Sequence, residues 1–120
     1  MSYTYEFPRP SVTTDILVFS IRDGVLEVLL IERKFDPFKA AWAIPGGFVQ
    51  LDEDIHEGAL RELEEETGLA NIPIRQLGAY GDPGRDPRGR VITIAFIALV
   101  PSDDLIAIGG SDAQDARWFP

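Results

Sequence analysis

The sequence predicts one domain of the α/β or α+β class, built on a mixed β-sheet with a single helix in the middle of the chain. Several runs rich in β-branched and aromatic residues are separated by turn residues, as in the strands of a sheet. One central segment instead repeats its apolar residues every three or four positions, which is the period of a helix. A length of 120 residues is enough for one core, so we expect residues 1–120 to form a single domain.

Two strands joined by a tight turn are expected near the N-terminus. β-branched residues dominate Ser11–Ile21, and Val25–Glu32 is apolar enough for a strand that is covered on both faces. Between them, Arg22-Asp23-Gly24 forms a turn, in which the glycine supplies the positive φ that a tight hairpin requires.

Shorter strands are expected on both sides of the helix. Trp42–Ile44 is predicted to be a short strand that ends at Pro45-Gly46-Gly47, where paired glycines let the backbone approach a metal or a phosphate. After the helix, β-branched and apolar content predicts strands over residues 72–80, 90–100 and 116–119.

The helix itself is expected to run from about Asp54 or Ile55 to Thr67. Asp52 and Asp54 are suitable N-caps, and Gly68 follows the last periodic residue, where a left-handed conformation commonly ends a helix. The apolar side that would pack on the sheet consists of Ile55, Ala59, Leu60 and Leu63.

The same segment concentrates acidic residues to an unusual degree. Eight of the twenty acidic residues lie between Asp52 and Glu66, and such crowding repels itself unless a cation is present. On a helix, Glu62, Glu65 and Glu66 occupy positions i, i+3 and i+4 and share one flank, which we expect to point away from the core. Three carboxylates on one flank form an oxygen-rich site suited to Mg²⁺ or Mn²⁺.

Composition excludes several classes of protein. Without cysteine, the chain can form no disulfide, zinc–thiolate site or thiol nucleophile. A formal net charge of −9 argues against nucleic acid as the main partner. No basic region followed by an apolar run begins the chain, and no apolar segment approaches ~18 residues. We therefore expect a cytoplasmic protein that does not insert into a membrane.

Residues 47–69 resemble the Nudix box, the signature of a large hydrolase superfamily. The pattern is Gly, five residues, Glu, seven residues, then Arg-Glu-apolar-any-Glu-Glu-any-Gly-apolar. Every defined position matches, and a chance match over this length is very unlikely. The matching residues are Gly47, Glu53, Arg61, Glu62, Leu63, Glu65, Glu66, Gly68 and Leu69.

This resemblance implies an α/β/α sandwich around a mixed sheet and hydrolysis of a nucleoside diphosphate linked to another group. It also implies that Arg61 pairs with a box glutamate, and that Glu53 is an accessory or outer ligand. Arg61, Glu62 and Glu65 would be the catalytic side chains. The implied ligands of the divalent metal are the carbonyl of Gly46 and the carboxylates of Glu62, Glu65 and Glu66.

The proton acceptor for the attacking water has two sets of candidates. Many Nudix relatives use an acid from a loop beyond the last long strand, and Asp112 and Asp115 are such acids here, together with Asp103 and Asp104. The alternative is that these are solvated loop residues and that Glu62 or Glu65 activates the water.

Two segments resemble the ADP-ribose pyrophosphatase group of this family. They are residues 10–15 and the loop at 81–89, where Pro83 lies fourteen residues beyond Leu69. The implied reaction converts ADP-ribose and water to AMP and ribose 5-phosphate. The candidate phosphate contacts are Arg33, Arg85 and Arg88, and the candidate adenine-stacking residues are Phe35 and Phe38, each with simple exposure to solvent as the alternative.

Two other functions fit the same resemblance. One is hydrolysis of nucleoside triphosphates, and the other is non-catalytic sensing of a nucleotide. Relatives commonly continue past the Trp-Phe-Pro end with a second helix that covers the sheet, and this helix is absent before Pro120. Either the protein continues beyond Pro120 or something else covers that face, because a bare sheet face would expose apolar surface. We therefore expect a homodimer or, for a monomer, low stability.

Overall fold

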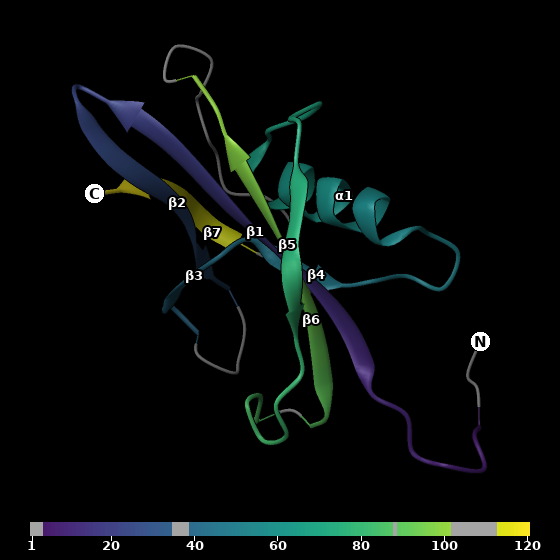
Figure 1. Ribbon diagram of the computed structural model, residues 1–120. Coiled ribbons are helices and arrows are strands. Elements are labelled where there is room, and N and C mark those ends of the chain that lie inside the picture. The colour runs from purple at the N-terminus through teal and green to yellow at the C-terminus, as the bar shows by residue number, and fades with distance from the viewer. Residues whose placement is uncertain (1–3, 35–38, 88, 102–112) are drawn as a thin grey trace.

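The computed structural model describes residues 4–34, 39–87, 89–101 and 113–120, with the backbone alone at 113–115. Figure 1 shows their elements in chain order. The elements are β1 (Ser11–Arg22), β2 (Val25–Arg33), β3 (Trp42–Ala43), β4 (Gly46–Phe48), α1 (Ile55–Thr67), β5 (Arg75–Tyr80), β6 (Val91–Leu99) and β7 (Ala113–Phe119).

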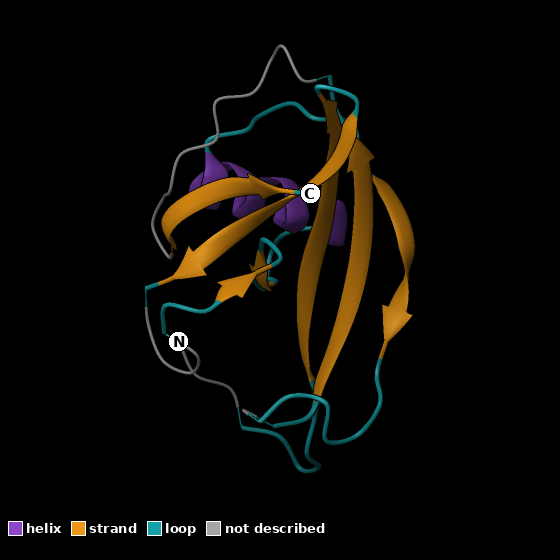
Figure 2. Cartoon of the chain, turned by 90° about the vertical axis from the view of Figure 1, so that its left-hand side faces the viewer, coloured by secondary structure: helices purple, strands orange, loops and turns teal. Residues whose placement is uncertain are grey.

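The strands form a mixed sheet in the order β3-β2-β1-β6-β5, with β4 paired to β1 and β7 paired to β2. β1 runs parallel to β6 and antiparallel to β2 and β4. The strands and the helix can be followed in Figure 2. The predicted class, a mixed sheet with one central helix, is confirmed. In the described residues only one of the two helical layers of the expected sandwich is present.

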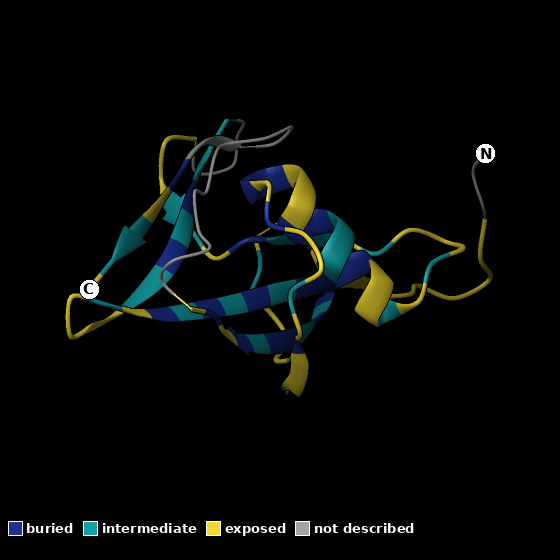
Figure 3. Ribbon diagram, turned by 90° about the horizontal axis from the view of Figure 1, so that it is seen from above, coloured by how far each residue is buried: buried dark blue, intermediate teal, exposed yellow. Residues whose placement is uncertain are grey.

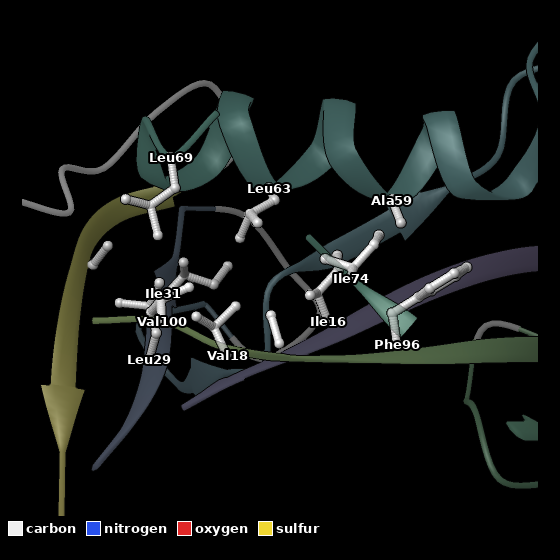
Figure 4. Packing of buried hydrophobic residues seen from close by; sticks show 12 residues of the cluster. Ile16, Val18, Leu29, Ile31, Ala59, Leu63, Leu69, Ile74, Phe96 and Val100 are labelled. Carbon is white, nitrogen blue, oxygen red and sulfur yellow. The ribbon is translucent and has the colours of Figure 1, made fainter. Parts of the chain in front are cut away.

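The core lies between α1 and one face of the sheet (Figure 4). Ile16 and Val18 of β1 are fully buried there, together with Ala59 and Leu63 of the helix. Because side chains alternate along a strand, the positions between them face the other side of the sheet. This alternation of buried and more exposed residues along the strands is visible in Figure 3.

The helix begins and ends close to the predicted residues. Asp54 occupies the N-cap position with extended backbone, but its side chain makes no capping hydrogen bond. Gly68 ends the helix in the left-handed conformation, with φ of 80°, and its N–H donates to the carbonyl of Glu64 at 2.8 Å. The predicted glycine stop is confirmed. Among the described residues, no helix is both long enough and apolar enough to cross a bilayer.

Two strand predictions are wrong. β2 is not covered on both faces, because its first residues Val25 and Leu26 lie exposed at the tip of the β1–β2 hairpin. Gly46 and Gly47 do not simply end β3, because they form β4 and pair with Asp15 and Thr14 of β1. This short strand is what brings the backbone of residues 46–48 beside the helix.

Candidate active site

A pocket of about 460 Å³ lies where β1, β4, β6, the helix and the loop after β5 meet. Its walls are mainly polar and carry both signs of charge. The charged residues that line it are Asp15, Arg33, Arg61, Glu62, Glu66, Arg85 and Asp86.

Arg61 is the centre of the charge network beside this pocket. Its Nε and Nη2 donate to the two carboxylate oxygens of Glu53, at 2.9 and 2.8 Å. Its Nη1 donates to Glu62 at 2.8 Å and to Glu65 at 3.0 Å, and Nη2 also donates to the carbonyl of Phe48 at 3.2 Å. One guanidinium therefore neutralises part of the charge of three box glutamates and ties them to β4.

These contacts keep the ionic forms stable. The hydrogen bond from Arg61, followed by one from the N–H of Gln50, lowers the pKa of Glu53 from its usual 4.5 to about 2. In return, the hydrogen bond to Glu53 raises the pKa of Arg61 above its ordinary value. Both side chains consequently remain charged at neutral pH.

Glu62 and Glu66 lie outside the hydrophobic core cluster and line the pocket, and they are buried, with 7% and 3% of their surface exposed. Glu66 Oε1 accepts a hydrogen bond from the N–H of Gly46 at 2.8 Å. A Cβ on Gly47 would lie 2.6 Å from the carboxyl carbon of Glu62. They are buried because β4 has no side chains at Gly46 and Gly47, so its backbone approaches the helix and covers the carboxylates.

The three predicted carboxylate ligands of the metal do not all line the pocket. Glu65 turns to Arg61 and is 42% exposed, whereas Glu62 and Glu66 line the pocket. In the part of the chain that is described, no group of three Asp, Glu, His or Cys side chains is arranged to hold a metal ion. The side-chain atoms around the pocket that could coordinate a metal are nevertheless all oxygens, and the carbonyl of Gly46 lies nearby. Such a set of ligands fits a hard divalent cation.

The predicted substrate-binding residues divide into two groups. Arg33 and Arg85 line the pocket. Arg88, Phe35 and Phe38 lie outside the described residues.

The predicted base candidates are only partly located. Asp103, Asp104 and Asp112 lie outside the described residues. Asp115 is in β7, in register with Glu32 of β2, so the expectation that it belongs to a loop is wrong.

The pocket-lining residues that sequence reasoning missed include Thr13, Asp15, Asp86 and Thr93. Thr13 and Asp15 alternate with the buried apolar residues of β1, and this alternation could have identified them as residues of the opposite face. No comparable pattern marks Asp86, which lies in an irregular loop. The place of Thr93 depends on the pairing of β6 with β1, in which it lies opposite Thr13.

Residues 11–120 match the model of the NUDIX domain family. The chain belongs to the NUDIX domain family. The match covers the whole sheet, the helix and the pocket, so the fold expected from the resemblance is confirmed.

The chain is also similar to three proteins whose names refer to ADP-ribose. It is 48% identical over 101 residues to an ADP-ribose pyrophosphatase of Methanocaldococcus jannaschii, covering 81% of this chain and 59% of that protein. It is 40% identical over 97 residues to the ADPR responsive transcriptional repressor NtrR of Acinetobacter baylyi, covering 79% of this chain and 39% of that protein. The chain thus spans about three fifths or less of these relatives.

The third is a solved structure, the NUDIX domain of Shewanella oneidensis NrtR complexed with ADP ribose. It has a TM-score of 0.87 and 33% sequence identity, covering 95% of this chain and 75% of that chain. The resemblance to the ADP-ribose pyrophosphatase group is confirmed at the level of the family.

Proposed function

We propose that this single Nudix domain, residues 1–120, hydrolyses the diphosphate bond of ADP-ribose, releasing AMP and ribose 5-phosphate. The observation that carries the proposal is the intact Nudix box with Glu62 and Glu66 facing a polar pocket that two arginines also line. The name of the Methanocaldococcus relative and the ADP ribose bound by the Shewanella domain support the choice of substrate.

We propose Mg²⁺ or Mn²⁺ as the cofactor. The carbonyl of Gly46 and the carboxylates of Glu62, Glu65 and Glu66 would hold it, since all are hard oxygen donors. When bound, such a cation neutralises phosphate oxygens and lowers the pKa of a coordinated water. Glu65 would have to exchange its contact with Arg61 for the cation, and its exposure leaves it room to turn.

The protein's own residues supply the remaining steps. Arg33 and Arg85 would contact the diphosphate oxygens, and the support for this is that both line the pocket and carry positive charge. Arg61 keeps Glu53 and Glu62 oriented by the hydrogen bonds described above. A carboxylate must take the proton of the attacking water, and the candidates are Asp112, Asp115, Glu62 and Glu65.

A substrate panel tests this proposal. ADP-ribose and nucleoside triphosphates are incubated with the protein and Mg²⁺ or Mn²⁺, with and without EDTA, and the products are separated by chromatography. We expect AMP from ADP-ribose, no release in EDTA, and recovery when excess metal is added. Pyrophosphate from a triphosphate, with no AMP from ADP-ribose, would instead support the triphosphate hydrolase.

A second candidate is a non-catalytic sensor of ADP-ribose. The similarity to the ADPR responsive repressor of Acinetobacter favours it, as does the absence of Glu65 from the pocket that Glu62 and Glu66 line. Calorimetry distinguishes the two functions. Tight binding of ADP-ribose without AMP release, at every metal concentration, would support the sensor.

A further inference from the structure

Two threonines on neighbouring strands form a buried hydroxyl pair beneath the pocket. Thr13 of β1 and Thr93 of β6 are direct partners in the parallel pairing, and their Oγ1 atoms lie 2.7 Å apart. Only 5% and 3% of their surface is exposed. Both lie on the face opposite to Ile16 and Phe96, so the pair belongs to the pocket and not to the core under the helix.

Arg85, in the loop after β5, hydrogen-bonds to this threonine pair. Its Nη1 donates to Thr93 Oγ1 at 2.8 Å. A guanidinium can only donate, so the oxygen of Thr93 must accept, and its own proton or that of Thr13 makes the bond between the hydroxyls. Both buried hydroxyls are thereby satisfied, which makes the arrangement specific, because losing any member leaves a buried polar atom without its partner.

The loop that carries Arg85 is folded back toward β6. The N–H of Arg85 donates to the carbonyl of Asp82 at 3.4 Å, and Gly84 between them adopts a left-handed φ of 79°. At the base of the loop, Arg90 donates to the carbonyl of Gly81. The backbone thus directs residue 85 toward the sheet, and Thr93 selects among the many rotamers of its side chain.

We propose that the Thr13–Thr93 pair is a positioning element that holds the Arg85 guanidinium over the pocket to receive the diphosphate of a nucleotide substrate. The inference rests on the proposed function and extends it. The bond to Thr93 uses Nη1, one of three nitrogens in a group with five N–H donors. An arginine that is already ordered loses less conformational freedom when the anion arrives.

The test is a comparison of Thr93→Val with Thr93→Ser. Valine keeps the shape and the β-branching of the strand but removes the hydroxyl. We expect KM and Kd for ADP-ribose to rise by roughly 2- to 10-fold, the cost of ordering one long side chain, with a smaller change in kcat. Serine keeps the hydroxyl and should recover most of the affinity lost in Thr93→Val. Thermal unfolding of each variant checks that the fold is intact.

A double-mutant cycle with Arg85→Ala separates positioning from a general structural effect. If Thr93 acts through Arg85, then Thr93→Val changes KM in the parent and changes nothing further in Arg85→Ala. If Thr93 only supports the strand, it changes KM by the same factor in both backgrounds. That equal factor, or an unchanged KM in Thr93→Val itself, would overturn the proposal.

Failure of the proposed function gives a different result. If the parent turns over no nucleotide, the same cycle is read as Kd for ADP-ribose by calorimetry in EDTA. A parent that neither binds nor hydrolyses ADP-ribose overturns both proposals. A parent that hydrolyses it while Thr93→Val matches the parent in KM and Kd overturns the positioning role alone.

Discussion

Arg61 organises the box through contacts that no other cationic side chain could reproduce. It binds the carboxylate of Glu53 through two nitrogens and also reaches Glu62, Glu65 and the carbonyl of Phe48. Lysine keeps the charge but has a single nitrogen and no planar fork. We predict that Arg61→Lys lowers the free energy of unfolding by about 1–3 kcal/mol and reduces turnover.

Urea unfolding in EDTA measures this effect without metal binding. Arg75→Lys is the matched control, because Arg75 is exposed on β5, away from the pocket. An Arg61→Lys variant as stable and active as the control would contradict the role assigned to the guanidinium.

Glu53 makes stability depend on pH in a defined direction. Its pKa is lowered to about 2 in the folded protein from an ordinary 4.5, so the folded state favours the ionised carboxylate. This contribution is fully present above pH 4.5 and is lost progressively as the pH falls from 4.5 toward about 2. We predict that Glu53→Gln is less stable than the parent at neutral pH and that the difference shrinks across this window.

Urea midpoints measured across the window check the prediction. Glu64→Gln removes an exposed carboxylate of α1 and should keep the parent's pH dependence. A constant difference between the parent and Glu53→Gln at every pH would refute it.

The identities of the site residues follow from sequence better than their orientations do. Spacing places Glu62, Glu65 and Glu66 on one flank of the helix, because the helical period is fixed. The burial of Glu62 and Glu66 depends on the approach of β4, which is a tertiary contact without a local signal. The same holds for Thr93, whose partner Thr13 is eighty positions away in sequence.

Among the elements, β4 contains two glycines that are required for different steric reasons. A Cβ on Gly46 would lie 2.0 Å from the carbonyl oxygen of Thr14, which is backbone and cannot move aside. A Cβ on Gly47 would meet only the end of the Glu62 side chain, at 2.6–2.8 Å. We predict that Gly46→Ala costs about 3 kcal/mol or more in stability. Gly47→Ala should stay folded but displace Glu62 and lose roughly 10-fold or more in activity.

Urea unfolding and AMP release, measured together, separate these effects. Gly78→Ala is the control, since the nearest atom to its Cβ would be the Tyr80 hydroxyl oxygen at 4.0 Å. If Gly47→Ala is as unstable in urea as Gly46→Ala, or if it keeps full activity, then the approach of β4 does not set the position of Glu62.

The helix was predictable nearly to the residue because its period, its acidic start and its terminal glycine are all local signals. β1 and β6 were similarly clear from their β-branched content. β4 was not, because a strand of three residues with two glycines has no strand propensity of its own. It exists through its hydrogen bonds to β1, with Gly46 opposite Asp15 and Phe48 opposite Thr13.

In the molecule as a whole, the C-terminal ends of β1 and β6 carry exposed apolar side chains. Ile21 is 58% exposed and Leu99 is 69% exposed, and the two line one shallow pocket with Val100 and Pro101. The expected homodimer stays a prediction, and this surface is where we expect it to form. Leu99→Lys should then convert the dimer to a monomer in sedimentation, whereas Leu51→Lys, at another exposed leucine, should not.

A parent that sediments as a monomer at all concentrations would contradict the dimer. It would leave the pocket chemistry unaffected, because the described lining residues all come from one chain.

The proposed metal-dependent hydrolysis depends on the buried acidic flank of α1, and Glu66→Gln removes the carboxylate on which it should depend most. Glutamine keeps the size of Glu66 and an oxygen for the Gly46 N–H, but removes the charge that a divalent cation requires. Glu64→Gln, an exposed glutamate two residues away, controls for the change in net charge. With Mg²⁺ and ADP-ribose, we predict that AMP release falls by at least about 100-fold in Glu66→Gln and stays at the parent rate in Glu64→Gln. A Glu66→Gln variant that releases AMP as fast as the parent would contradict the claim.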